Sequence, residues 1–350
     1  MIKKITLISL WIVALSAALI WPKHALLTKS KAPELHIFSW GNNIDEATLT
    51  AFEERSGCRL RMHSYESNEE MLTKLKATGG SGYDLIIPSD YAVALLIKEG
   101  LVQPLDKEKL PFIDTLSPYL MGNEFDPDNT YSLPLQWEVL GFGVNKETFG
   151  EEPLSYRHVF ENFGYNIVMV NDPVEAISLA AHHLFGHKRK LTKDERRQVK
   201  ELLTAQKGHV EAYVESRADY LLSTRNCELA ISPSSYIWRL EKERGDIRFA
   251  LPEDHVFLEI ESIAIPKNAE KIDLIYAFIN HLYEKESLIS QANTYYFMPP
   301  TDRVIDELEF SDKMHHLLKE LSQRDDQTLK YFRHMMAEKE IRKLWIDVKS

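Results

Sequence analysis

The stretch Tyr83-Asp84-Leu85-Ile86-Ile87-Pro88-Ser89-Asp90-Tyr91 shows the structural unit from which the chain is built. Its apolar centre, Leu85 to Ile87, is typical of a buried strand, and Pro88-Ser89-Asp90 then turns the chain into a helix. A strand followed at once by a helix is the repeating unit of a doubly wound sheet. In such sheets ligands bind at the carboxyl ends of the strands, so functional residues are expected just after each strand.

The same alternation recurs on both sides of this stretch. Strands are predicted at 35–38, 60–63, 167–170, 228–232 and 263–266. Helices are predicted at 45–55, from 68 to about 78, after Pro173, at 275–282 and over the charged tail 330–346. Two further segments, 131–134 and 140–144, read as extended crossings between two domains that could hinge. The pattern predicts an α/β protein.

The composition limits the classes of partner. The chain has 350 residues, enough for two domains, and 42 Lys and Arg against 53 Asp and Glu give a net charge of -11. This acidity argues against a nucleic-acid partner and favours a cationic ligand. Cys58 and Cys227 lack the paired spacing of a zinc or redox motif and are expected to be small buried side chains.

The first 22 residues resemble an export signal. Lys3 and Lys4 precede an uncharged apolar run from Ile5 to Trp21, which is followed by polar chain. The small-residue site Ser16-Ala17-Ala18 is a poor match to a cleavage site, so a cleaved signal peptide and a retained membrane anchor over 5–21 both remain open. Either reading predicts that the rest of the chain works in the periplasm.

Motifs for catalysis or metal binding fail on their spacing. The segment 78–82 is rich in glycine but lacks the Gly-Lys-Ser/Thr ending of a phosphate loop, and Ser81 lacks the downstream glycine of a nucleophile elbow. His183 and His187 are four residues apart without the intervening Glu of a metalloprotease helix. We therefore predict no catalytic residues, no metal and no cofactor.

Two pairs of carboxylates lie close to predicted strands. Asp172 follows the strand 167–170, and Glu175 is three residues later; a simple helix cap is the alternative role for Asp172. Glu259 and Glu261 share one face just before the strand 263–266, where a solvated strand edge is the alternative. Either pair could also act as the acid–base pair of an extracytoplasmic hydrolase.

Taken together, these segments resemble the spermidine/putrescine-binding proteins of bacterial polyamine ABC importers. The order and spacing hold from about residue 35 to 300. The matching stretches are 38–40, 64–69, 83–91, 131–134, 143–145, 171–175 and 261–266.

The resemblance implies a two-lobed periplasmic-binding-protein fold of type II, in which each lobe is a sheet flanked by helices with a hinge between the lobes. One lobe is expected to comprise 33–139 and 261–304, and the other 140–260 and 305–350. The family pattern also implies a monomeric receptor that closes around its ligand and performs no covalent chemistry.

In that family, aromatic faces enclose the methylene chain of the ligand while acidic side chains hold its ammonium groups. Glu259 replaces a family tryptophan and adds a carboxylate, Pro233 replaces another tryptophan, and Gly41 and Asn43 also depart from the pattern. The implied ligand-binding residues are Trp40, Ser89, Tyr91, Asp172, Glu175, Glu259, Glu261 and Phe297.

The sequence thus predicts an extracytoplasmic receptor that captures spermidine, putrescine or a similar organic cation and delivers it to an inner-membrane ABC permease. Cation–π contacts worth about 0.5–2 kcal/mol each, together with paired carboxylates, are enough for micromolar capture. The alternatives are the hydrolase described above and a membrane-tethered sensory module, which the weak cleavage site suggests.

Overall fold

The structure, a computed structural model, describes residues 32–41, 43–161, 164–214, 217–322 and 329–350. The predicted signal or anchor over residues 1–22 lies outside these ranges. Within them, no helix is long and apolar enough to cross a membrane.

The first half of the fold is built from three parallel strands and one antiparallel strand. β1 (Glu34–Trp40) pairs with β2 (Arg59–Tyr65) on one side and with β3 (Leu85–Ile87) on the other, and β10 (Val256–Pro266) runs antiparallel to β3. The helices of this half are α2 (Glu46–Ser56), α3 (Asn68–Thr78), α4 (Asp90–Lys98), α11 (Ile272–Leu282) and α12 (Lys285–Tyr295).

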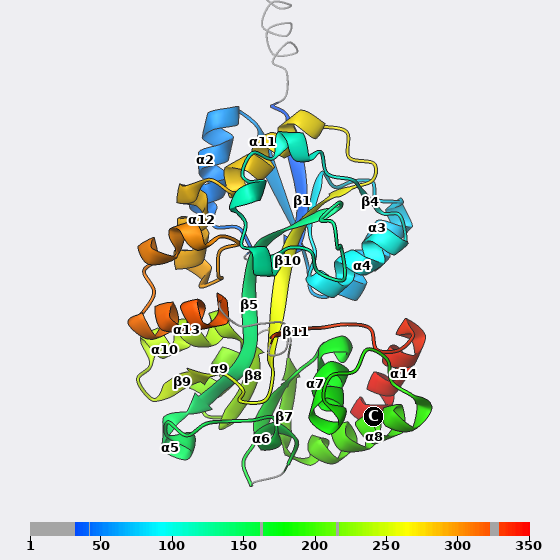
Figure 1. The fold of residues 1–350 in the computed structure, drawn as a ribbon, viewed down its shortest axis with the longest axis vertical. Coiled ribbons are helices and arrows are strands. Elements are labelled where there is room, and N and C mark those ends of the chain that lie inside the picture. Colours follow the sequence, from blue (N-terminus) through cyan, green and yellow to red (C-terminus); the bar gives the residue numbers. More distant parts are fainter. Residues whose placement is uncertain (1–31, 42, 162–163, 215–216, 323–328) are drawn as a thin grey trace, which may run out of the picture.

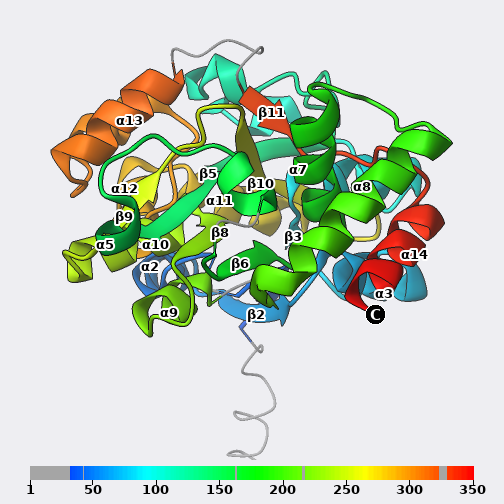
Figure 2. The ribbon, with the colours of Figure 1, turned by 90° about the horizontal axis from the view of Figure 1, so that it is seen from below.

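The second half repeats this arrangement with other strands. β6 (Ile167–Val170) lies between the parallel strands β7 (Val210–Val214) and β8 (Leu229–Pro233), and β5 (Ser132–Asn145) runs antiparallel to β8. α7 (Pro173–Phe185), α8 (Lys193–Gln206) and α14 (Glu338–Lys349) pack together on one side of this half, and α9 (Ala218–Ser223) and α10 (Ser234–Glu243) on the other (Figure 2). The sequence shows no internal repeat, yet both halves share one strand order.

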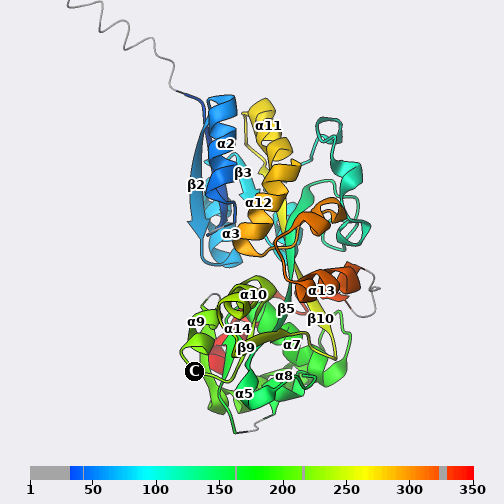
Figure 3. The ribbon, with the colours of Figure 1, turned by 90° about the vertical axis from the view of Figure 1, so that its left-hand side faces the viewer.

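The two halves are joined by the long strands β5 and β10. These strands pair antiparallel from Leu140↔Phe257 to Ser132↔Ala264, with a bulge after Glu261. Figures 1 and 3 show both strands running from one half into the other. The described strands therefore form one sheet in the order β2-β1-β3-β10-β5-β8-β6-β7, with β4 (Val102–Gln103), β9 (Ile247–Ala250) and β11 (Leu329–Tyr331) paired at its side.

The remaining helices are short or peripheral: α5 (Lys146–Phe149), α6 (Arg157–Phe160) and α13 (Asp312–Ser322). Helix ends follow the sequence signals. Asp45 and Ser67 accept hydrogen bonds at the starts of α2 and α3, and Gly57 and Gly79 end these helices at φ 66° and 62°, where a side chain would be strained. Cys58 and Cys227 are buried, as predicted, and both are free thiols.

The α/β class is confirmed. Segments 131–134 and 140–144 are extended as predicted, and from Ser132 onward they belong to one continuous strand, because residues 135–139 are also extended and buried. Two local predictions are wrong. Glu259 and Glu261 lie inside β10 rather than before it. The predicted tail helix 330–346 begins only at Glu338, because Leu329 to Tyr331 instead pair with β10.

The glycine at position 141 allows β5 to pack closely against the neighbouring strand β9. A Cβ atom added to Gly141 would clash with the Phe249 ring and lie 2.9 Å from the carbonyl oxygen of Ala250 on β9. The backbone oxygen cannot move without breaking the pairing of β5 with β9, so this position requires glycine.

We therefore expect Gly141→Ala to lower the free energy of unfolding by about 1–3 kcal/mol, the usual cost of overpacking a core. Urea denaturation would measure the change. Gly245→Ala is the matched control, since a Cβ there meets nothing within 4 Å. Equal effects of the two substitutions would contradict this account of β5.

Candidate ligand-binding site

A cavity of about 540 Å³ lies where the carboxyl ends of the parallel strands of both halves meet. Trp40 and Tyr65 end β1 and β2, and Ser89 follows β3. From the second half, β6, β7 and β8 contribute their last residues: Val170, Val214 and Pro233. Each half therefore presents the end of its sheet that the sequence pattern marks as functional.

Acidic side chains dominate the titratable residues of the cavity wall. Two arginines, Arg217 and Arg239, also line it, and Arg239 is paired with Asp219 at 2.9 Å. The acidic lining residues are Glu66, Asp90, Glu138, Glu175, Asp219, Glu259 and Glu261. Seven carboxyl groups against two guanidinium groups make the cavity a site for a cation.

Three of these carboxyl groups come from the strands that join the halves. Glu259 and Glu261 are two residues apart on β10, and Glu138 lies directly opposite Glu259 on β5. Ser89 Oγ donates to Glu261 Oε1 at 3.0 Å, and the Ser235 backbone N–H donates to Glu138 Oε2 at 3.3 Å. Glu259 Oε1 and Glu261 Oε2 are shielded from solvent and have no hydrogen-bond partner among the described residues.

Burial and crowding make these carboxyl groups difficult to ionise. Burial, with further repulsion from neighbouring carboxylates, raises the pKa of Glu259 and of Glu261 well above the usual value. Burial also raises the pKa of Glu138 to about 7 and that of Asp90 to about 8. A bound cation would reverse this effect, because it would supply the missing opposite charge.

Aromatic side chains complete the wall. Trp40 packs against Tyr65 with a centroid distance of 4.7 Å, and its Nε1 donates to Ser89 Oγ at 3.2 Å. Both contacts fix the indole ring beside the carboxylate of Glu261. The other aromatic lining residues are Tyr91, Tyr220, Tyr236, Phe297 and Phe332.

Asp172 is the one predicted site residue that does not line the cavity. Its Oδ1 caps α7 by accepting the backbone N–H groups of Val174 and Glu175, so the helix-cap interpretation is confirmed. Its Oδ2 accepts a 2.5 Å hydrogen bond from the Tyr91 hydroxyl, which in turn accepts one from Asn68 Nδ2 at 2.7 Å. Asp172 therefore joins the second half to the first through Tyr91.

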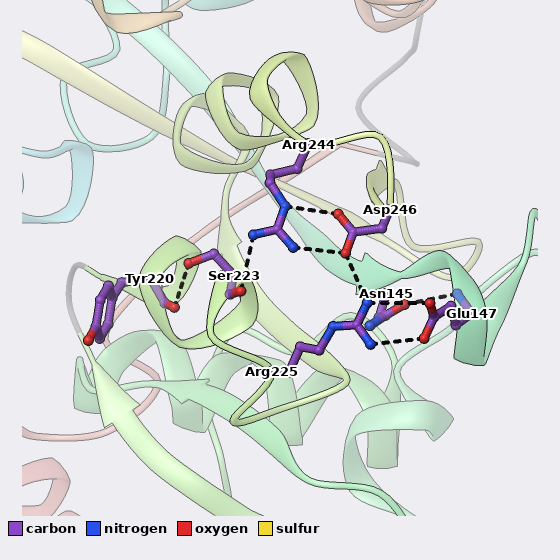
Figure 4. Close-up of polar contacts among 7 residues, drawn as sticks. All are labelled: Asn145, Glu147, Tyr220, Ser223, Arg225, Arg244 and Asp246. Carbon is purple, nitrogen blue, oxygen red and sulfur yellow. Dashed lines mark hydrogen bonds and ion pairs between the residues drawn. The ribbon is translucent and has the colours of Figure 1, made fainter.

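A polar network on the far side of α9 fixes the helix that carries Asp219 and Tyr220 (Figure 4). Ser223 Oγ donates to the Tyr220 carbonyl at 2.8 Å, and Arg244 Nη1 donates to the Ser223 carbonyl at 3.3 Å. Arg244 also binds Asp246 through two hydrogen bonds. These contacts hold the end of α9 against the loop after α10.

The structure brings together seven of the eight predicted site residues: Trp40, Ser89, Tyr91, Glu175, Glu259, Glu261 and Phe297. The strand-edge alternative for Glu259 and Glu261 is wrong, because β10 lies inside the sheet between β3 and β5. Sequence reasoning missed Glu138, Tyr236 and Phe332. A signal for Glu138 existed: it is the one ionisable residue in the run 132–145, which is otherwise apolar or neutral.

The fold and this acidic, aromatic cavity define a binding protein for a small solute. The chain belongs to the family of bacterial extracellular solute-binding proteins, whose pattern matches residues 47–317. It is thus an extracytoplasmic solute-binding protein and not an enzyme, and the cavity offers no reason to retain the hydrolase alternative.

Similar proteins are known in several bacteria. The chain is 32% identical to the putrescine/cadaverine-binding protein of Pseudomonas aeruginosa, over 72% of this chain and 75% of that protein. It is 26% identical to the spermidine/putrescine-binding periplasmic protein of Escherichia coli, over 76% and 77%. The structure of a putative spermidine/putrescine ABC transporter from Listeria monocytogenes matches with a TM-score of 0.82 and 26% identity, over 91% of this chain and 99% of that chain.

The raised pKa of Glu138 makes a prediction about stability. Its pKa is about 7 in the folded protein against a usual 4.5, so ionisation opposes folding increasingly as the pH rises from about 4.5 to 7. We expect Glu138→Gln to stabilise the ligand-free protein at pH 8 by up to about 3 kcal/mol and to have little effect near pH 4.5.

Urea denaturation at both pH values would measure this difference. Glu253→Gln, which changes an exposed carboxylate, is the control and should have no pH-dependent effect. A stability change for Glu138→Gln that is the same at both pH values would contradict the conclusion that burial raises the pKa of this carboxyl group.

Proposed function

We propose that this protein captures a polyamine outside the cytoplasm and delivers it to an ABC importer. The observation that carries the proposal is a pair of solvent-shielded carboxylate oxygens, Glu259 Oε1 and Glu261 Oε2, which have no hydrogen-bond partner in the described part of the chain and lie in a cavity walled partly by aromatic rings. Buried charge of one sign is very costly unless the opposite charge is supplied. Two similar proteins, a putrescine/cadaverine-binding protein and a spermidine/putrescine-binding protein, support the same ligand class.

The distribution of acids favours a long cation with several charges. Glu175 enters from the start of α7, Glu66 follows β2, and Glu138, Glu259 and Glu261 lie together on the joining strands. A polyamine carries ammonium groups separated by methylenes, so its charges can reach separate carboxylates. Trp40 and Phe297 offer flat apolar faces to the methylenes between them.

The pair Glu138–Glu259 supports a preference within this class. Both carboxyl groups face the same cavity from adjacent strands, and Glu261 adds a third. A diamine satisfies two groups of acids, whereas a triamine or tetramine supplies another ammonium for the central pair. The proposed order of affinity is therefore spermine and spermidine above putrescine.

Transport would follow from closure of two hinged lobes over the cavity. We place one lobe at 33–139 plus 261–304 and the other at 140–260 plus 305–350, because the cavity receives side chains from both sets of elements. The receptor would act as a monomer in the periplasm and present the closed form to an inner-membrane permease. The run 5–21 would act as an export signal or an anchor.

Isothermal titration with putrescine, spermidine and spermine is the direct test. We expect saturable 1:1 binding at or below micromolar Kd, tightest for spermidine or spermine. Because the cation favours ionised carboxylates, binding should release protons, and affinity should fall as the pH is lowered from 8 to 6, through the raised pKa of Glu138.

Glu259→Gln should reduce the affinity for spermidine more than that for putrescine, while the exposed control Glu253→Gln should alter neither. Absence of heat and of a thermal shift with all three polyamines would refute the proposed ligand class.

The hydrogen bond from the Tyr91 hydroxyl to Asp172 predicts how substitution of Asp172 affects polyamine binding. Asp172→Asn should weaken polyamine binding at least tenfold because it weakens the hydrogen bond from Tyr91, not because a ligand contact is lost. Tyr91→Phe should then weaken binding to a similar extent, and the double variant should be little worse than either single variant.

Titration calorimetry on the three variants gives this cycle directly. Fully additive losses would instead show that Asp172 and Tyr91 act independently, as they would if the Asp172 carboxylate contacted the ligand itself.

A further inference from the structure

A second cavity, of about 680 Å³, lies beside the acidic one. Its walls come from α4, the segment 118–125, the chain after α7 and the segment 329–334, which includes β11. Tyr91 and Phe332 are the residues that line both cavities, so the two spaces are separated by these rings. The second cavity is large enough for a small organic molecule.

The charge of this second cavity is opposite to that of the first. Among the described residues that line it, Lys98, Arg189, Lys330 and Arg333 are basic and Glu124 is the single acidic residue. This excess of positive charge stands out in a chain whose net charge is -11. A local field of this sign attracts an anion.

Glu124 carries one negative charge and lies between the guanidinium groups of two arginines. Its Oε1 lies 2.7 Å from Arg189 Nη2, and its Oε2 lies 3.1 Å from Arg333 Nη1. The Arg333 Nη1 atom is shielded from solvent, and its contact with Glu124 is an ion pair without hydrogen-bond geometry. A shielded guanidinium group whose Nη1 makes no hydrogen bond among the described residues is suited to a carboxylate or another planar oxyanion.

Aromatic residues form another part of the wall. Phe332 is buried, and Tyr119, Phe125 and Tyr331 are partly buried around the same space. Tyr119 and Tyr331 are tied together, since the Tyr331 hydroxyl donates to the Tyr119 carbonyl at 3.2 Å. Flat apolar surface beside cationic groups fits a molecule with an anionic end and a planar apolar body.

We infer that this cavity is a second binding site, which takes a small organic anion with an aromatic body. The site differs from the proposed polyamine site in the sign of its charge and in its lining, apart from the two shared rings. It stands whether or not the first cavity binds a polyamine.

The fluorescent aromatic sulfonate 1-anilinonaphthalene-8-sulfonate is a suitable probe. Titrated into the full chain without polyamine, it should bind saturably at one site, and benzoate should displace it. The double variant Lys98→Gln/Arg189→Gln should weaken binding at least tenfold. Both side chains are exposed, so the variant is expected to fold.

Arg197→Gln is the matched control, because Arg197 is similarly exposed on α8 and does not line this cavity. Its affinity for the probe should equal that of the unmodified protein. No saturable binding, or equal binding by the double variant, would overturn the inference. Displacement by inorganic phosphate as effective as that by benzoate would also overturn it, since charge alone would then explain binding. Polyamine titration is a separate measurement, so failure of either proposal leaves the other testable.

Discussion

The repulsion among buried carboxyl groups is the interaction on which the arrangement of the cavity depends. Glu138, Glu259 and Glu261 lie on paired strands, where neighbouring side chains on one face are forced close together. In water such groups would be ionised at neutral pH, but burial raises their pKa values because the charged form loses its hydration. A protein that only needed a stable core would place apolar residues here. These acids therefore make sense as one half of a charge pair whose other half is the ligand.

The joining strands explain why the acids stand at the centre of the molecule. β5 and β10 pair with each other and also supply the antiparallel strand that ends the three parallel strands of each half. Side chains on these strands therefore keep their positions relative to both halves. In the proposed closure, side chains at the ends of the parallel strands, such as Trp40 and Pro233, would instead move with their own half. The closure would thus divide the site into a fixed acidic floor and walls that close over it.

Much of the fold could be predicted from the sequence, because the signals that begin and end its helices and strands are local. A cap and a glycine define α2, and an apolar triplet followed by Pro88-Ser89-Asp90 defines β3 and the start of α4. β5 could not be read in full, because residues 135–139 include Gln136 and Glu138, whose burial depends on distant partners. The prediction of a helix over 330–346 is wrong at its start for a similar reason, because the pairing of Leu329–Tyr331 with β10 overrides the helical pattern.

The candidate site was predicted as far as the family resemblance carried it. Trp40, Tyr91 and Glu261 were identified by matching positions, but Glu138 required the register of β5 against β10, which no local pattern gives. Asp172 was predicted to bind the ligand by the same resemblance, but it does not line the cavity. The structure shows that its oxygens are occupied by the α7 backbone and by Tyr91, and no local pattern predicts the contact with Tyr91.

Tyr91 links several of these features because its ring lines both cavities while its hydroxyl joins the two halves. A hydrogen bond to a charged acceptor contributes about 1.5–3 kcal/mol, which is also the size of a typical coupling free energy between sites. Any ligand that shifts the Tyr91 ring must change this bond, and any ligand that strengthens the bond holds the ring in place. If both proposed sites bind ligands, occupation of the second cavity and occupation of the acidic cavity would be connected through this one side chain, and linkage would require the effect to be mutual. The opposite charges of the two cavities would favour the state in which both are filled, since a bound cation and a bound anion on either side of Tyr91 would attract each other.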